Sequence, residues 1–410
     1  MIVDIINKKR LGYELSYKEI ETIFNGYLKG DVKDYQMSSF LMAICINGCS
    51  DDEVFSITKV FIDSGEVLSF PEEFGICVDK HSTGGIGDKT TLVVAPIVAA
   101  CGVTMVKMSG RGLGYTGGTI DKLESIPGFR VNLTDSEIIE QVKNIGVSLS
   151  SQTQELVPLD KLIYALRDVT GTVSSIPLIA SSIMSKKIAS GADKILIDIK
   201  VGKGALINTK KDALELERIM KKIGKIYNRD VRCIISNMNI PLGYYIGNSL
   251  EVIEAIEILR GREKNNNLYD LCIEISTKLV SLAKNIKEID AYKEVCYVLD
   301  NKIAYNKFVE LVKRQGGDLK ELEVAKYKKL LKSKNNGIIK DINALEIGKL
   351  CMMIGAGRVN KNSKIDYTVG IKLNKQVGDY CKKGEVLGIV YVNDKVKLPS
   401  IEELFTISNN

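Results

Sequence analysis

Two glycine-rich segments constrain the fold of this 410-residue chain most strongly. Asp79–Thr91 reads DKHSTGGIGDKTT and Lys107–Thr119 reads KMSGRGLGYTGGT, and each segment follows a short apolar run and precedes a helical pattern. Glycines allow backbone N–H groups to surround an anion, and the N-terminus of the following helix adds partial positive charge. Two such segments on neighbouring strands predict one shared anion site at the carboxyl ends of those strands.

Short apolar runs alternate with helical patterns through the middle of the chain. Such runs are typical of buried parallel strands, and their alternation with helices predicts an α/β domain. The expected strands are Ile76–Asp79, Thr104–Lys107, Ile195–Asp198 and Val231–Ile235, and the expected helices include Thr91–Ala100 and Asp212–Ile226.

The first 65 residues instead predict a small domain of three or four helices. Ser16–Glu19 and Ser50–Glu53 match the capping box, in which two side chains bond to the backbone N–H groups exposed at a helix start. Gly30, Gly48 and Gly65 follow amphipathic segments, where a helix C-cap favours glycine with a positive φ.

These changes of pattern divide the chain into five parts. We expect a small helical domain and a larger α/β domain, each discontinuous in sequence, followed by a β-rich α+β unit with strands at Tyr367–Lys372 and Gly384–Tyr391. The predicted parts are residues 1–66 (helical domain), 67–159 (α/β domain with the anion loops), 160–190 (insert completing the helical domain), 191–336 (rest of the α/β domain) and 337–410 (C-terminal unit).

Composition and charge exclude several classes of function. The formal net charge is +6, from 57 Lys and Arg against 51 Asp and Glu, and the lysines are scattered. Nucleic-acid binding requires a clustered basic face, so the small excess favours small anionic ligands. Nine cysteines without a C-x-x-C pair and a single histidine leave no candidate zinc site and predict free thiols in a reducing cytosol. The longest apolar stretch, Thr91–Val103, is too short to span a bilayer, so we expect a cytoplasmic protein without a membrane segment.

Polar side chains in two parts of the chain are candidates for chemistry. His81 is the only histidine of the chain. A single histidine more often has a structural role, but its position in the first glycine-rich segment, at the end of a strand, favours a catalytic role. Ser182 and Lys186 are four residues apart and share one helix face. Arg167 lies in the same helical insert. The three residues are candidates for ligand binding, and the alternative is that they form a polar face exposed to solvent. The expected side-chain donors to the anion are Lys80, Ser82, Thr91, Ser109 and Thr119.

Two known nucleotide-binding motifs are near matches. Gly87–Thr90 resembles the end of a P-loop, but Asp88 puts a carboxylate where that loop approaches phosphate. Residues 112–117 match G-x-G-x-x-G after a strand, which keeps an NAD-dependent oxidoreductase as an alternative. No strand ending in an acid follows about 20 residues later to bind a ribose hydroxyl, which counts against that alternative.

Long runs of this sequence resemble the thymidine and pyrimidine nucleoside phosphorylase family, and most closely its broad-specificity bacterial branch. The resemblance implies a helical domain hinged to an α/β domain, an active site in the cleft between them, and a homodimer. It implies phosphate-dependent cleavage of uridine, thymidine and deoxyuridine, with no organic cofactor. A non-catalytic relative that acts as a binding protein remains a further alternative. The runs are Val78–Asp88, Ser109–Glu124, Tyr164–Thr170, Ser181–Lys187, Pro241–Gly243, Asn248–Val252 and Gly355–Arg358.

The resemblance also implies roles for individual residues. Arg167, Ser182 and Lys186 match the residues that hold the pyrimidine ring, and His81 matches a residue near the ring's O2, so that His81, Arg167 and Lys186 form the expected catalytic set. Tyr115, Lys203 and Leu206 depart from the family pattern near its mobile loops. The positions matching phosphate-binding residues are Lys80, Ser82, Thr91, Lys107, Ser109 and Thr119, with Lys107 also typical of the broad-specificity branch.

One departure concerns a cation. The broad-specificity branch binds potassium at positions that match Gly87, Leu242, Tyr245 and Glu254, with a threonine where this chain has Lys89. A lysine ammonium carries the same charge and offers three donors to the same oxygens. We therefore expect Lys89 to replace the ion and to pair with Glu254. The alternative is that Lys89 points into solvent and the ion site is retained.

Overall fold

The structure is a computed structural model that describes residues 2–112, 114–115, 117–153, 155–358 and 363–408. The chain forms two compact units, and each is discontinuous in sequence. Unit 1 comprises residues 1–73, 153–197 and 209–233, and unit 2 comprises residues 74–152, 198–208 and 234–410. The boundaries of the finer, five-part division expected from the sequence stay a prediction.

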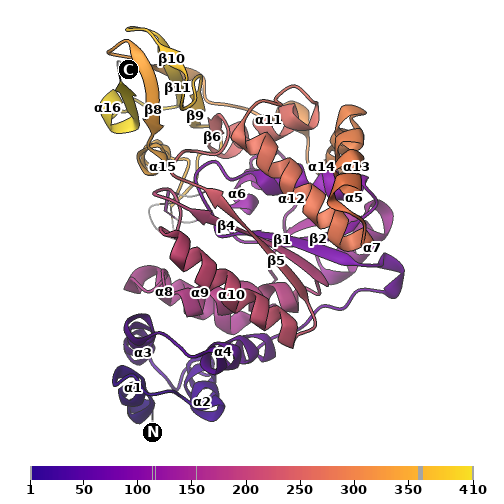
Figure 1. Ribbon diagram of the computed structural model, residues 1–410, viewed down its shortest axis with the longest axis vertical. Coiled ribbons are helices and arrows are strands. Elements are labelled where there is room, and N and C mark those ends of the chain that lie inside the picture. The colour runs from indigo at the N-terminus through magenta and orange to yellow at the C-terminus, as the bar shows by residue number, and fades with distance from the viewer. Residues whose placement is uncertain (1, 113, 116, 154, 359–362, 409–410) are drawn as a thin grey trace. The chain divides into compact units, whose positions relative to one another are not determined.

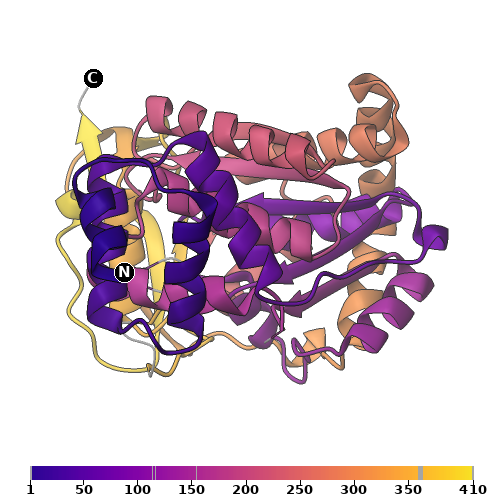
Figure 2. The ribbon, with the colours of Figure 1, turned by 90° about the horizontal axis from the view of Figure 1, so that it is seen from below.

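Unit 1 is mainly helical, as the sequence predicts for residues 1–66 and 160–190, and it also contains residues 194–197 and 230–233 of two strands. Both expected capping boxes are present, at Ser16 with Glu19 and at Ser50 with Glu53. The core of the N-terminal bundle centres on Phe24, whose ring meets Phe40 and Phe61 edge to face at centroid distances of 5.7 and 5.3 Å. Figures 1 and 2 show the first four helices, in indigo, gathered in one bundle. The helices are α1 (Ile2–Arg10), α2 (Tyr17–Leu28), α3 (Asp34–Asn47), α4 (Asp51–Asp63), α8 (Pro158–Thr170), α9 (Ile176–Ala189) and α10 (Lys210–Ile226).

The three glycines that follow α2, α3 and α4 are required for two different reasons. Gly30 and Gly48 have φ values of 80° and 68°, so the predicted positive-φ caps are confirmed at these two positions. The same prediction is wrong for Gly65, because α4 ends at Ser64 in a right-handed conformation and Gly65 has no positive φ. A Cβ atom at Gly65 would lie 2.1 Å from the carbonyl oxygen of Glu155. Glycine is required there by close approach of another backbone segment.

A five-stranded sheet contains all four predicted strands. Its order is β3-β2-β1-β4-β5, and β1, β2 and β3 run parallel to one another. The edge strand β3 was not among the predicted strands. The boundary between the two units passes through β4 and β5. The strands are β1 (Cys77–Ser82), β2 (Thr104–Ser109), β3 (Val147–Ser151), β4 (Lys194–Val201) and β5 (Asp230–Asn237).

Helix α5 (Thr90–Ala100) is the central helix of unit 2. It is buried from Thr90 to Ala99 because it packs against other helices as well as against β2 and β3. A helix that is apolar on all sides requires such a position. No helix among the described residues is long and apolar enough to cross a membrane. The other helices of this part of unit 2 are α6 (Thr119–Glu124), α7 (Asp135–Ile145), α11 (Asn248–Leu259), α12 (Asn267–Lys284), α13 (Glu288–Asp300) and α14 (Ile303–Arg314).

The C-terminal part of unit 2 is rich in antiparallel strands, as predicted. One sheet has the order β6-β9-β11-β7 and the other the order β10-β8-β12 (Figure 1). The strand expected from Tyr367 begins later, at Gly370. The elements are β6 (Tyr245–Ile246), β7 (Tyr327–Lys332), β8 (Gly337–Ile342), α15 (Ala344–Met353), β9 (Gly370–Leu373), β10 (Tyr380–Cys381), β11 (Val386–Val392), α16 (Ile401–Leu404) and β12 (Phe405–Ser408).

The side chain of Gln315, just after α14, covers the free edge of β3. Its amide nitrogen donates to the carbonyl oxygen of Leu149 at 2.8 Å, and its amide oxygen accepts from the Leu149 N–H at 3.4 Å. The same fully buried amide also donates to the carbonyl of Arg130 and accepts from Gln141. Gln315 thus supplies the donor and the acceptor that a further strand would offer.

Replacement of Gln315 by alanine should destabilise unit 2, because it leaves buried backbone groups of β3 without partners. We expect the midpoint of thermal unfolding to fall by about 6 °C or more. Asn144→Ala removes an exposed amide from α7 and should change the midpoint by about 1 °C at most. Equal midpoints for the two variants would show that the edge contact contributes nothing.

Candidate active site

The two glycine-rich segments begin at the ends of neighbouring strands in unit 2. The first joins the end of β1 at Ser82 to the start of α5, and the second joins the end of β2 at Ser109 to the start of α6 at Thr119. Because β1 and β2 are paired parallel neighbours, both segments leave the same edge of the sheet. This edge is where open α/β sheets bind ligands.

The residues predicted to bind an anion lie around this edge. Lys80, Lys107 and Thr91 are buried, whereas Ser82, Ser109 and Thr119 are half-buried. The hydroxyl of Ser109 is buried and has no hydrogen-bond partner among the described residues. His81 lies on β1 between Lys80 and Ser82 and is also half-buried.

Asp88 lies within the first segment and was not predicted to contribute to the site. Its carboxylate accepts hydrogen bonds from Ser82 Oγ and from Thr90 Oγ1. Burial alone would raise the pKa of Asp88, but Lys80, Lys200 and these hydrogen bonds hold it well below its usual range. Asp88 is therefore ionised at neutral pH.

Two further lysines at this sheet edge are buried beside carboxylates. Lys107 Nζ is 3.7 Å from Asp79, and Lys200 Nζ donates to Asp198 at 2.6 Å. Burial lowers the pKa of Lys200, but Asp88 and Asp198 outweigh that effect and raise it, so Lys200 stays charged. The sequence analysis named Lys107 as a candidate phosphate-binding residue and did not name Lys200. Lys200 lies in β4, where only the apolar run Ile195–Asp198 was noted.

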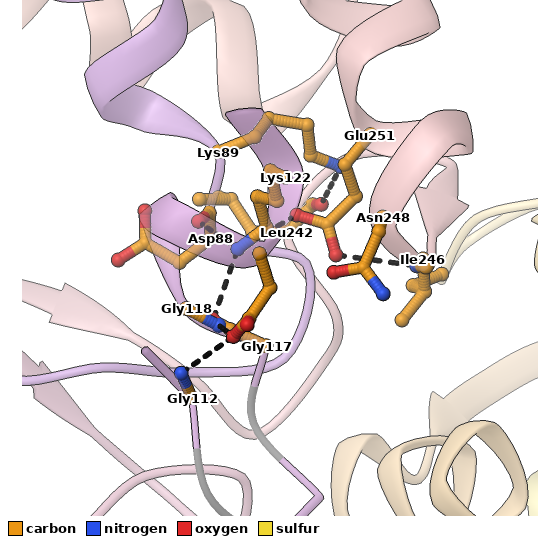
Figure 3. A network of polar contacts seen from close by, with 12 residues as sticks. Asp88, Lys89, Gly112, Gly117, Gly118, Lys122, Leu242, Ile246, Asn248 and Glu251 are labelled. Carbon is orange, nitrogen blue, oxygen red and sulfur yellow. Dashed lines mark hydrogen bonds and ion pairs between the residues drawn. The ribbon is translucent and has the colours of Figure 1, made fainter. Parts of the chain in front are cut away.

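Lys89 makes the contacts that the sequence predicts for it, and Figure 3 draws it beside Leu242, one of its partners. Its ammonium donates to the carbonyls of Leu242 and Tyr245 at 3.0 and 2.6 Å and to Glu254 at 2.5 Å. Both charged side chains are fully buried. The alternative in which Lys89 points into solvent is therefore wrong.

Lys122, on α6, connects the two glycine-rich segments. Its buried ammonium donates to the carbonyl of Asp88 in the first segment at 2.8 Å and to that of Gly117 in the second at 3.0 Å (Figure 3). Glu251 on α11 balances the charge at 3.2 Å. Because one side chain bonds to both segments, it fixes their separation.

Asp121 joins two parts of the second segment that are six residues apart in sequence, Gly112 and Gly118. Its carboxylate accepts from the N–H groups of Gly112 and Gly118 at 2.6 and 3.2 Å and pairs with Arg358 at 2.8 Å. Gly112 is the first glycine of the G-x-G-x-x-G match, whose backbone would have to approach a dinucleotide pyrophosphate, and Gly118 directly follows the match. Use of these N–H groups by Asp121 counts against the oxidoreductase alternative, although Leu113 and Thr116 of that motif lie outside the described residues.

Arg167, in unit 1, is buried rather than on a solvated polar face. Its guanidinium donates to the carbonyls of Thr172, Val173 and Leu178 at 3.3, 2.8 and 3.2 Å. A guanidinium has five N–H donors, and these bonds to described residues use three of them. Burial is the main cause that lowers the pKa of Arg167.

Lys186 and Ser182 meet on α9, as their spacing predicts. Lys186 Nζ donates to Ser182 Oγ at 2.7 Å and to Asp160, a residue that the sequence analysis missed. Burial lowers the pKa of Lys186, and the Asp160 carboxylate opposes that effect. The Tyr164 ring lies 5.6 Å from the Arg167 guanidinium and 5.7 Å from Lys186 Nζ, so an aromatic face joins this cationic cluster.

Comparison with known proteins identifies the family. The chain is 49% identical over 399 residues to the pyrimidine-nucleoside phosphorylase of Bacillus subtilis (strain 168), which covers 96% of this chain and 92% of that relative. The chain belongs to the pyrimidine-nucleoside phosphorylase family. The corresponding protein of Geobacillus stearothermophilus is 46% identical over the same shares of both chains.

Family models and a solved structure agree with this assignment. Models described as "Glycosyl transferase family, helical bundle domain" and "Glycosyl transferase family, a/b domain" match residues 3–65 and 75–301, and "Pyrimidine nucleoside phosphorylase C-terminal domain" matches residues 338–408. The crystal structure of anthranilate phosphoribosyltransferase from Thermus thermophilus aligns with a TM-score of 0.60 at 16% identity, over 76% of this chain and 99% of that one. That likeness supports the fold alone.

Removal of the Lys122 ammonium should loosen both glycine-rich segments. We compare the double variant Lys122→Met, Glu251→Gln with Glu251→Gln alone, so that no unpaired carboxylate is left in the double variant. The amide hydrogens of Gly117 and Gly118 should exchange about tenfold faster in the double variant. Equal exchange in the two proteins, measured by mass spectrometry, would contradict a role of Lys122 in holding the segments.

Proposed function

We propose that this protein catalyses the reversible phosphorolysis of pyrimidine nucleosides to the free base and ribose or deoxyribose 1-phosphate. The observation that carries the proposal is the 49% identity of the chain, over 96% of its length, to a protein named pyrimidine-nucleoside phosphorylase. The residues that resemble the family's phosphate and pyrimidine ligands are all present in the chain. Loss of His81, Arg167 or Lys186 would have supported a non-catalytic relative, and all three are present.

The sheet edge of unit 2 is the proposed phosphate site. Lys80 and Lys107 provide positive charge there, and Ser82, Ser109 and Thr119 provide hydroxyl donors. Thr91, on the first turn of α5, lies where the helix adds partial positive charge. A bound phosphate oxygen would attack C1′ of the nucleoside, and positioning of the two reactants supplies much of the rate enhancement. No organic cofactor is needed for this chemistry.

The cationic cluster of unit 1 is the proposed pyrimidine site. When the bond from C1′ to N1 breaks, its electron pair leaves with the base and spreads onto the ring oxygens. Arg167 and Lys186 would stabilise that negative charge, and Ser182 would bond to a ring edge. His81 would donate a hydrogen bond or a proton to O2.

The wild-type protein should release free base from uridine, thymidine and deoxyuridine only when phosphate is present. His81→Ala should lower turnover by about 10²-fold without loss of folding. His81→Gln retains a hydrogen-bond donor and should restore part of the rate. Chromatography of the released base measures both effects, and near-wild-type turnover in folded His81→Ala would remove His81 from the mechanism.

We also propose that Lys89 takes the place of the potassium ion used by the broad-specificity branch. The carbonyls of Leu242 and Tyr245 and the carboxylate of Glu254 already accept hydrogen bonds from its ammonium. The residues present therefore do not fit an additional ion. Gly87 supports this arrangement, because a Cβ there would lie 2.6 Å from the Leu242 carbonyl oxygen.

Exchange of potassium for sodium should change neither the activity nor the unfolding midpoint of the wild type. Lys89→Thr supplies an oxygen in place of the ammonium and should make both quantities depend on potassium. Lys89→Met is the matched control, since it removes the charge but offers no oxygen ligand. Potassium dependence in the wild type would contradict the replacement.

The proposal includes a homodimer in the cytoplasm, as the family resemblance implies. The absence of a membrane-spanning helix among the described residues is compatible with that location. Sedimentation equilibrium of the purified protein measures its assembly state directly.

A further inference from the structure

Two side chains proposed to bind phosphate are already engaged by a carboxylate of the same loop. Ser82 Oγ donates a hydrogen bond to one oxygen of Asp88, and Lys80 Nζ lies 3.9 Å from the other. The Lys80 and Asp88 side chains are 1% and 8% exposed. Asp88 thus accepts a hydrogen bond from Ser82 and lies within ion-pair range of Lys80, two of the groups that an incoming anion needs.

Thr90 completes the arrangement. Its hydroxyl and its backbone N–H donate to Asp88 Oδ1 at 2.6 and 3.2 Å, and Lys80 Nζ donates to the same hydroxyl. These bonds keep the Asp88 carboxylate and Lys80 beside each other. The carboxylate occupies the loop in the manner of a bound anion, held by hydroxyl, amide and ammonium groups.

The charges at this sheet edge are balanced before any ligand binds. Lys80, Lys107 and Lys200 each lie beside a carboxylate, and these are Asp88, Asp79 and Asp198 respectively. An arriving phosphate therefore does not meet three free cations. It must compete with a resident negative charge for the same donors.

We propose that Asp88 is an internal anion that phosphate displaces from Ser82 and Lys80, so that Asp88 sets how tightly phosphate binds. This inference rests on the proposed function, because it takes Lys80 and Ser82 as phosphate ligands. Asp88 is a positioning residue here: it holds the donors in place while the site is empty and opposes the anion once it is bound. A sugar 1-phosphate product is opposed in the same way, which favours its release.

Asp88→Asn removes the negative charge and leaves an amide oxygen to accept from Thr90. Inorganic phosphate, titrated calorimetrically into the full-length protein, should bind about tenfold more tightly or better to this variant than to the wild type. A purely structural role would give the opposite result, because a damaged loop binds phosphate more weakly. Unchanged or weaker binding overturns the inference.

Glu124→Gln is the matched control for the change in net charge. Glu124 lies on α6 and pairs with Arg111, outside the Asp88 cluster, so its loss should leave phosphate affinity within about twofold. An equal tightening in both variants would mean that the overall field, and not displacement of Asp88, controls affinity. That result also overturns the inference.

Crystal structures of the wild type with and without phosphate test the exchange of partners without a variant. With phosphate bound, Ser82 Oγ should donate to a phosphate oxygen in place of Asp88. Retention of the Ser82–Asp88 bond overturns the inference.

Failure of the proposed function would give a different result. The wild type would then bind phosphate but release no base from nucleosides, or it would bind no phosphate at all. The two failures are therefore distinguishable.

Discussion

Burial of lysine ammonium groups is the constraint on which the arrangement of unit 2 depends. An ammonium removed from water is tolerated only with a carboxylate and enough oxygen acceptors around it. Lys89 and Lys122 meet that condition with backbone carbonyls from separate loops, and each is balanced by a glutamate of α11. Glu251 and Glu254 are three residues apart and lie on one helix face. A single helix therefore anchors both glycine-rich segments, because Glu254 pairs with Lys89 of the first segment and Glu251 pairs with Lys122, which bonds to both.

The same physics distinguishes the two proposed binding sites, one in each unit. At the sheet edge of unit 2, Lys80, Lys107 and Lys200 each lie beside a carboxylate. In unit 1 the Arg167 guanidinium is surrounded mainly by neutral carbonyls. Such an environment suits a ligand that is neutral when it binds and becomes negative only as its bond breaks.

The local parts of this structure could be predicted from the sequence, and the long-range pairings largely could not. Capping boxes, strand positions and the positions of the glycine-rich segments after strands depend on neighbouring residues, and these predictions are confirmed. The burial predicted for Val231–Ile235 is wrong in part, because Arg232 and Ile235 are exposed on β5. Lys89 with Glu254 was found only because family resemblance related positions 165 residues apart. Asp88, Asp121 and Glu251 gave no comparable signal, because an isolated acidic residue does not reveal its distant partner. Gly65 was misread because close approach of a distant backbone requires glycine as strictly as a positive φ does.

The amide of Gln315 has a consequence beyond the stability of one strand. An unpaired strand edge is a template on which another polypeptide can add a strand, and natural proteins protect such edges. Leu149 has its N–H and its carbonyl occupied by a side chain from the same molecule. At this position an approaching chain finds neither a donor nor an acceptor to pair with. A single glutamine side chain thereby makes this stretch of β3 a poor template for strand addition by a second copy of the chain.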